Sequence, residues 1–370
     1  LIRLKSLMKI LYFSVNMSGY TSASYQQDLI DSLKKKCDVI FWGPGYEKFD
    51  IDLDLNSIKK KLFISDNDCI IVGHSWLSDI PLKDEANYDN YYTWINERLI
   101  KNSIEYCGKI NFFEHKGPRL FLLNKEYVSL DEKLNFAKRN NFDYVLTSNL
   151  SFNDYEKKTN LKFIFLPYAI SKDFILKKNL NKKYDLFFSG LIQNQYFFNL
   201  NKIKSQRILI QKKLFYNFFD MPIMRKSSKF KIFWNIYTGT KVKDIILKIL
   251  RKYKRMPKTE YVEKLHESKV VLNTLSPDNL IGPRFYETMA SRAICLCEES
   301  DLINTVFKPM EHYVPLHSTD EILEKLSFCL SDSIEIEKIR ENSYDYVVSN
   351  HTYDIRADNI LNLIQQMQYK

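Results

Sequence analysis

The chain has 370 residues, of which 45% are hydrophobic and 27% are charged, and its formal net charge is +10. This length accommodates two domains of ordinary size, and no apolar run approaches the roughly 18 residues that a membrane-spanning helix needs. The positive charge would suit nucleic acid or an anionic membrane. No nucleic-acid-binding motif accompanies it, so we expect no nucleic-acid partner.

The first domain is predicted to begin with a βαβ unit. An apolar run at 9–15 is followed by a polar break that holds Gly19, a helical periodicity at 23–34 and a second apolar run at 38–42. This pattern is typical of doubly wound α/β folds, and Gly19 stands where such folds let the backbone approach a substrate. The Asp-x-Asp spacing at 50–54 precedes a helix-like stretch instead of following a buried strand, so we interpret it as a solvated loop and predict no metal site.

Polar residues follow two later strands of this domain. Four more strands are predicted, at 68–74, 120–123, 143–147 and 164–168. His74 ends the first of them, and Asn124 and Glu126 follow the second. These polar residues therefore follow the carboxyl ends of predicted strands. His74 would bind an acceptor or act as a base, and the alternative is a structural histidine.

The second domain is predicted to open with a strand at 184–188, which runs into the small-residue turn Ser189-Gly190. The stretch 201–258 is rich in Lys and Arg and poor in acidic residues. Within it, apolar residues recur at helical spacing over 242–253, which predicts an amphipathic helix with a basic polar face. This face is either an ordinary solvated surface or a contact with an anionic membrane.

A third pattern lies between two predicted buried strands at 270–275 and 293–297. Pro283 suits the first turn of a helix, where a missing N–H costs nothing, and Arg284 and Glu287 then share one face of that turn. Helix N-termini favour anions. The guanidinium can hold phosphate oxygens, and the carboxylate can accept hydrogen bonds from both hydroxyls of a ribose. The alternative is a surface Arg–Glu pair worth about 0.3 kcal/mol.

The order of strand, loop, Arg-Phe-Tyr-Glu-Thr-Met-Ala and strand resembles the donor-site segment of GT-B glycosyltransferases. It is similar in particular to the CgeB-like branch, which is related to the retaining group 1 family. The resemblance implies two doubly wound α/β domains that face a cleft. These would be an acceptor-side domain at 8–168, a donor-side domain at 169–350 and a C-terminal helix at 351–370 that packs back toward the first domain.

The same resemblance implies roles for the residues named above. Glu287 matches the glutamate that holds the ribose of the nucleotide sugar, and Arg284, Ser189 and Gly190 would lie at the diphosphate. In the first domain, His74 and Glu126 are the predicted catalytic residues, and Gly19 and Asn124 would line the acceptor side. Asn124 replaces a histidine that is common in group 1 enzymes.

Two departures from the family pattern keep other functions open. A second glutamate of the group 1 family is Asn279 here, and the usual glycine after the helix is Arg292. A non-catalytic binding or structural protein with a degenerate donor site is therefore one alternative. A GT-B type nucleotide-sugar epimerase is another.

The predicted function is sugar transfer from a UDP- or GDP-sugar to a glycan, lipid-linked or protein acceptor, with retention favoured. Surface polysaccharide or lipopolysaccharide assembly is the predicted setting, and no metal or other cofactor is expected. The six cysteines are scattered, and we interpret them as reduced core residues of a cytoplasmic protein. The basic helix would place the protein at the inner face of the membrane.

Overall fold

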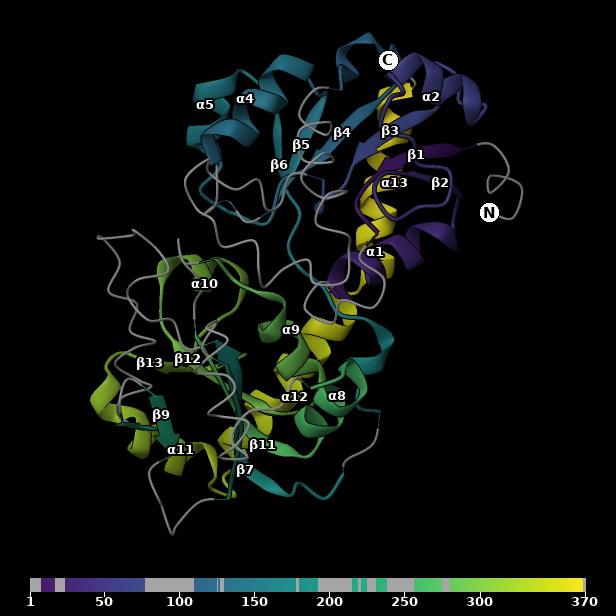
Figure 1. Ribbon diagram of the computed structural model, residues 1–370. Coiled ribbons are helices and arrows are strands. Elements are labelled where there is room, and N and C mark those ends of the chain that lie inside the picture. The colour runs from purple at the N-terminus through teal and green to yellow at the C-terminus, as the bar shows by residue number, and fades with distance from the viewer. Residues whose placement is uncertain are drawn as a thin grey trace. The chain divides into compact units, whose positions relative to one another are not determined.

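The computed structural model describes residues 8–16, 24–76, 110–124, 126, 130–177, 180–191, 215–218, 221–224, 231–237, 256–274 and 280–368 (Figure 1). The chain divides into two compact units, one of residues 1–167 with 353–370 and the other of residues 168–352. The predictions for Gly19, Asn279 and the basic helix at 242–253 lie outside the described residues.

Unit 1 contains a six-stranded sheet in the order β2-β1-β3-β4-β5-β6, in which all neighbouring strands are parallel. Its strands are β1 (Lys9–Phe13), β2 (Asp38–Trp42), β3 (Cys69–Val72), β4 (Arg119–Leu122), β5 (Tyr144–Thr147) and β6 (Phe163–Phe165). Strand β3 is buried along its whole length, as expected for an apolar, β-branched run in a sheet that is covered on both faces.

The helices of unit 1 are α1 (Ser24–Lys34), α2 (Leu55–Lys61), η4 (Phe112–Glu114), α4 (Leu130–Asn140), α5 (Asn153–Thr159) and α13 (Tyr353–Gln368). The last of these, α13, lies along α1 (Figure 1). Ile360 and Ile364 are buried on α13, and Lys36 forms a 2.7 Å ion pair with Asp358. Because exposed ion pairs contribute little, the apolar contacts supply most of the stability of this packing.

Unit 2 contains a five-stranded parallel sheet in the order β10-β7-β11-β12-β13. Its strands are β7 (Tyr184–Leu191), β10 (Ile232–Tyr237), β11 (Ser268–Asn273), β12 (Ile294–Glu298) and β13 (Val314–Leu316), with a separate antiparallel pair of β8 (Phe215–Phe218) and β9 (Met221–Met224). Its helices are η5 (Lys172–Phe174), α8 (Lys258–His266), α9 (Pro283–Ala290), α10 (Asp301–Val306), η7 (Thr319–Glu321), α11 (Ile322–Cys329) and α12 (Ile334–Asn350). The predicted fold class, two α/β units with parallel sheets, is confirmed.

Three smaller expectations can be compared with the described residues. Cys37, Cys69, Cys295, Cys297 and Cys329 are free and buried. Among the helices that the structure describes, none has the length and apolar character to cross a bilayer. Asp50 and Asp54 each accept a hydrogen bond from a nearby backbone N–H, so these carboxylates hold a turn and the start of α2.

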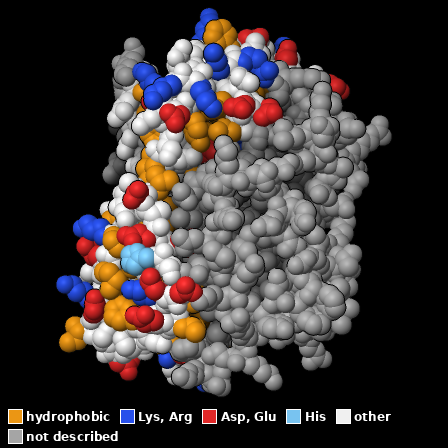
Figure 2. Space-filling model, turned by 90° about the vertical axis from the view of Figure 1, so that its left-hand side faces the viewer, with side chains coloured by type: hydrophobic (Ala, Val, Ile, Leu, Met, Phe, Trp, Pro, Cys, Tyr) orange, Lys and Arg blue, Asp and Glu red, His pale blue; other side chains and the backbone are white. Residues whose placement is uncertain are grey.

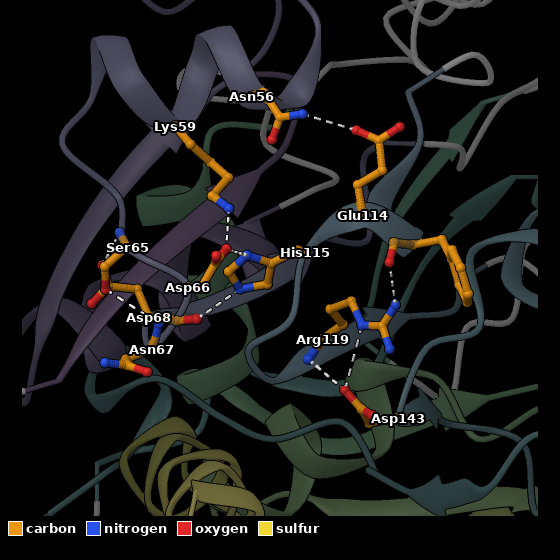
Figure 3. Close-up of polar contacts among 11 residues, drawn as sticks. Asn56, Lys59, Ser65, Asp66, Asn67, Asp68, Glu114, His115, Arg119 and Asp143 are labelled. Atoms are coloured by element: carbon orange, nitrogen blue, oxygen red, sulfur yellow. Dashed lines mark hydrogen bonds and ion pairs between the residues drawn. The ribbon is translucent and has the colours of Figure 1, made fainter.

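An ionic network lies at the amino-terminal edge of the unit 1 sheet, before β3 (Figure 3). Asp66 pairs with Lys59, and its Oδ1 lies 3.6 Å from Nδ1 of His115. Nε2 of His115 donates to the backbone oxygen of Asp68 over 2.8 Å. Burial lowers the pKa of His115, so the ring is neutral at pH 7. Because ligands bind at the opposite edge of such sheets, we assign this network to stability.

Lowering the pH is expected to destabilise the protein partly through His115. Its folded-state pKa lies below the ordinary histidine value of about 6.5, so the unfolded chain binds a proton first. The free energy of unfolding should therefore fall as the pH drops below about 6.5, until the folded-state pKa is passed. In His115→Gln, part of this fall should disappear when urea denaturation is compared at pH 7 and pH 5.5.

His317→Gln is the matched control for this experiment, because the side chain of His317 is 56% exposed. In this control, the free energy of unfolding should fall between pH 7 and pH 5.5 as it does in the wild type, because His115 is still present. A His115→Gln variant with the same pH dependence as the wild type would contradict the prediction.

Candidate active site

The predicted donor-side residues of unit 2 lie at one edge of its sheet. Strands β7 and β11 are neighbours in this sheet. The sheet strand that follows β7 in the chain, β10, lies on the side of β7 away from β11, whereas the strand that follows β11, β12, lies on the side of β11 away from β7. α/β folds bind ligands at the carboxyl edge where successive connections diverge in this way. Ser189 and Gly190 lie near the end of β7, and Asn273 ends β11.

Helix α9 begins at this edge, with Gly282 at its N-cap and Pro283 in its first turn. No side chain in the described part of the chain caps the helix, and a Cβ atom added to Gly282 would meet no described atom within 4 Å. The first turn therefore has no side-chain cap among the described residues, and it forms the positive end of the helix dipole. Such a position suits an anion.

The far side of α9 is apolar and holds the helix in place. Phe285, Tyr286 and Met289 are buried, and the Tyr286 ring lies 5.1 Å from Phe307 and 5.0 Å from His351. Burial of each such side chain stabilises the fold by about 1.5–3 kcal/mol. The predicted residues Arg284 and Glu287 lie on the partly exposed side of the helix.

Asn273 connects α9 to the sheet with polar contacts. Its side chain is fully buried, and Nδ2 donates to Oγ1 of Thr288 over 3.0 Å and to Sγ of Cys295 over 3.2 Å. A buried amide is costly unless it is bonded, so these contacts favour one position of α9 relative to β11 and β12. The sequence prediction missed this residue, although a polar residue that ends an apolar strand is a recognisable signal.

Tyr261, on α8, contacts both predicted residues of α9, Arg284 and Glu287. Its hydroxyl donates to Oε2 of Glu287 over 3.0 Å. Burial raises the pKa of Tyr261 and the charge of Glu287 raises it further, whereas Arg284, which interacts with the same phenol, opposes the rise. The phenol therefore stays protonated at neutral pH. A tyrosine within a helical pattern carries no sequence signal for such a role, and the sequence analysis did not find it.

At the carboxyl edge of the unit 1 sheet, the structure brings His74 and Asn124 to the same tyrosine. Asn124 donates to the hydroxyl of Tyr25 over 2.8 Å, and the Tyr25 and His74 rings lie 5.8 Å apart. Gly73 is required before His74, because a Cβ there would lie 2.4 Å from Cε1 of Tyr12. Burial lowers the pKa of His74 to about 4, so its ring is neutral at pH 7.

Glu126 lies close in sequence to this cluster and is almost fully buried. Oγ1 of Thr147, the last residue of β5, donates to Oε1 of Glu126. Lys133, which is buried on α4, donates to the backbone oxygen of Asn124 over 2.8 Å. Asn124 and Glu126 are therefore held by partners from α1, α4 and the end of β5. Tyr25, Thr147 and Lys133 were not predicted, because each comes from a different element and only the packing of these elements brings them to the sheet edge.

Residues 226–362 match the model of a family described as glycosyl transferase-like. A search of curated proteins gives no match. Among solved structures, the sucrose-phosphate synthase of Thermosynechococcus elongatus is similar over 97% of this chain and 98% of its own, with a TM-score of 0.62 and 10% identity. Anabaena HepE in complex with UDP and glucose covers 97% and 100%, with a TM-score of 0.57 and 11% identity. The chain therefore has the GT-B fold, and residues 226–362 form a glycosyl transferase-like domain.

A third similar structure is a DNA-modifying β-glucosyltransferase, with a TM-score of 0.54, 16% identity and coverage of 97% of this chain and 100% of its own. Likenesses at these identities establish the fold, and the domain match supplies the glycosyltransferase assignment. The resemblance inferred from the Arg-x-x-Glu segment is confirmed. The roles of the individual site residues remain predictions.

Arg292 departs from the glycine usual in this glycosyltransferase family, and the structure explains how it is accommodated. Its φ is 52°, in the left-handed region that favours glycine. The guanidinium forms an ion pair with Glu341, lies 3.7 Å from the Tyr344 ring centroid and donates from Nε to the backbone oxygen of Leu176 over 3.3 Å. These contacts offset the backbone strain, so Arg292 is a structural residue and gives no support to a degenerate donor site.

Substitutions at Arg292 should separate the strain from the contacts. Arg292→Gly loses the contacts but relieves the left-handed strain, whereas Arg292→Ala loses the contacts and keeps the strain. We expect both variants to be less stable than the wild type, with Ala below Gly by about 1 kcal/mol. Chemical denaturation of the three proteins measures this order, and a Gly variant no more stable than the Ala variant would contradict it.

Proposed function

We propose that this glycosyltransferase uses a UDP- or GDP-sugar as its donor and transfers the sugar to a hydroxyl group of an acceptor. The observation that carries the proposal is the start of α9, where Arg284 and Glu287 lie on one partly exposed face of a helix that has no side-chain cap among the described residues. A nucleoside diphosphate presents both an anion and a diol, which match these two side chains. The UDP complexes of Anabaena HepE make UDP the first nucleotide to test.

We propose that different groups of the site bind the diphosphate and the ribose of the donor. The N–H groups at the start of α9 and the Arg284 guanidinium would hold the diphosphate. The backbone at Ser189 and Gly190 lies at the same edge of the sheet and would approach it closely. The Glu287 carboxylate would accept hydrogen bonds from the two ribose hydroxyls.

The reaction breaks the bond between the anomeric carbon and the diphosphate oxygen and forms a bond from that carbon to the acceptor oxygen. The negative charge that develops on the departing diphosphate would be stabilised by Arg284 and the helix dipole, so the proposal needs no metal ion. The acceptor proton must leave, and His74 and Glu126 are the groups we propose near it. Because His74 is neutral at pH 7 with a pKa of about 4, it suits orientation of the acceptor better than removal of its proton. Retention of configuration is the outcome that the group 1 resemblance implies.

A glycan or lipid-linked acceptor in surface polysaccharide assembly is the setting we propose, with the protein at the inner face of the membrane. The basic stretch 201–258 supports this setting, since Lys and Arg favour anionic lipid. On the face shown in Figure 2, the described Lys and Arg side chains are interspersed with Asp and Glu. The described part of that face therefore offers no single-sign patch, and the proposed membrane contact rests on the sequence of the basic stretch.

Replacing Glu287 with alanine is expected to weaken nucleotide binding by about 1.5–3 kcal/mol, the range for hydrogen bonds to a charged group. The fold should survive, because Glu287 is only partly buried. Calorimetric titration with UDP, GDP, ADP and CMP would identify the nucleotide that the wild type prefers and then measure its affinity in the variant.

Glu324→Ala provides the matched control, because Glu324 is exposed on α11 of the same unit. Its nucleotide affinity should equal that of the wild type. If Glu287→Ala also binds the preferred nucleotide as tightly as the wild type, Glu287 does not contact the ribose.

Substitution of His74 or Glu126 is expected to reduce turnover far more than donor affinity, because acceptor orientation and proton transfer act in the transition state. His74→Gln and Glu126→Gln would be compared by kcat and by donor Kd. General acid–base contributions are about 100-fold or more, which sets the expected loss for at least one variant. Near-wild-type turnover in both variants would remove these residues from the site.

A further inference from the structure

The first turn of α9 depends on a side chain from another helix. Tyr261 of α8 donates its hydroxyl proton to Oε2 of Glu287 over 3.0 Å, and the same phenol interacts with Arg284. A phenol oxygen can accept as well as donate, so one group can satisfy a cation and an anion at the same time.

The position of this phenol is set by packing. The Tyr261 ring lies 6.1 Å from the Phe174 ring and 5.9 Å from the Phe187 ring, measured between centroids. Phe174 and Phe187 are themselves buried, the first in η5 and the second in β7. The hydroxyl is therefore held by the core of unit 2 and not by a mobile surface chain.

We infer that Tyr261 is a positioning residue that makes the site selective for a ribonucleotide over its 2′-deoxy analogue. Its hydroxyl occupies one acceptor position of the Glu287 carboxylate and fixes the rotamer. A carboxylate has about four acceptor sites, so the same group, held in one rotamer, can also accept from the two ribose hydroxyls, as the proposed function requires. The inference rests on that function, because the diol is the ligand group that it assigns to Glu287.

If the Glu287 carboxylate could rotate, it could pair with Arg284 in place of the ribose. Arg284 and Glu287 are three residues apart on one helix face, a spacing at which arginine and glutamate attract each other. Direct pairing would occupy the carboxylate that the ribose needs and the guanidinium that the phosphate needs. A phenol that contacts both side chains reduces the gain from such pairing.

Tyr261→Phe removes the hydroxyl and keeps the ring, so it tests the positioning role directly. Calorimetry would compare UDP with 2′-deoxy-UDP, and GDP with 2′-deoxy-GDP, on the full chain. The wild type should prefer the ribonucleotide by about tenfold or more. In the variant this preference should fall toward unity through weaker ribonucleotide binding, and with the sugar nucleotide KM should rise while kcat changes little.

Tyr313→Phe is the matched control. Tyr313 is buried in the same unit, and its hydroxyl donates to Oδ1 of Asn304 over 2.6 Å, so this variant also loses one hydroxyl and its hydrogen bond. It should keep the ribonucleotide preference of the wild type. A second measurement uses Glu287→Gln, because in that background Tyr261→Phe should change the preference no further if it acts through Glu287.

The outcomes separate this inference from the proposed function. Wild-type protein that binds no nucleotide overturns the proposed function and the inference with it. A wild-type preference that persists in full in Tyr261→Phe overturns the positioning role and leaves the proposed function standing. Equal loss of affinity for the ribonucleotide and its deoxy analogue shows that Tyr261 acts on the general structure of the site, which also overturns the inference.

Discussion

The placement of the first turn of α9 is the constraint on which the donor side of this protein depends. A helix this short has few contacts of its own, so its position comes from what it buries and what it bonds. Phe285, Tyr286 and Met289 bury one side, and Asn273 connects the helix to two strands. These contacts occupy the buried side of α9. Arg284 and Glu287 therefore lie on its partly exposed side, at the edge of the sheet.

At the carboxyl edge of each of the two sheets, polar side chains bond to partners from other helices or strands. Tyr261 serves Glu287 in unit 2, and in unit 1 Asn124 bonds to Tyr25. A buried polar group without a hydrogen-bond partner lowers the stability of the fold by about 1–3 kcal/mol. Each partner therefore stabilises the fold and also fixes the orientation of the group that it bonds. The same contacts therefore explain stability and preorganisation.

Arg292 shows how a departure from a family pattern can be structural in origin. The backbone there adopts the left-handed conformation that the family's glycine would provide, so the requirement of the fold is unchanged. Arginine is tolerated in this conformation because its side chain contacts Glu341, the Tyr344 ring and the backbone oxygen of Leu176. Sequence comparison registers a lost glycine, whereas the structure shows a retained conformation.

The sequence alone determined the fold class, the strands of unit 1, the strands β7, β11 and β12 of unit 2, and the helix start at Pro283. Strand burial, helix periodicity and proline placement are local properties, and each is written in consecutive residues. It also indicated Arg284 and Glu287, since their spacing on one helix turn is local too. The tertiary structure alone decided the partners, Asn273 with Thr288 and Tyr261 with Glu287, because these contacts join segments whose approach depends on how the whole sheet and its helices pack.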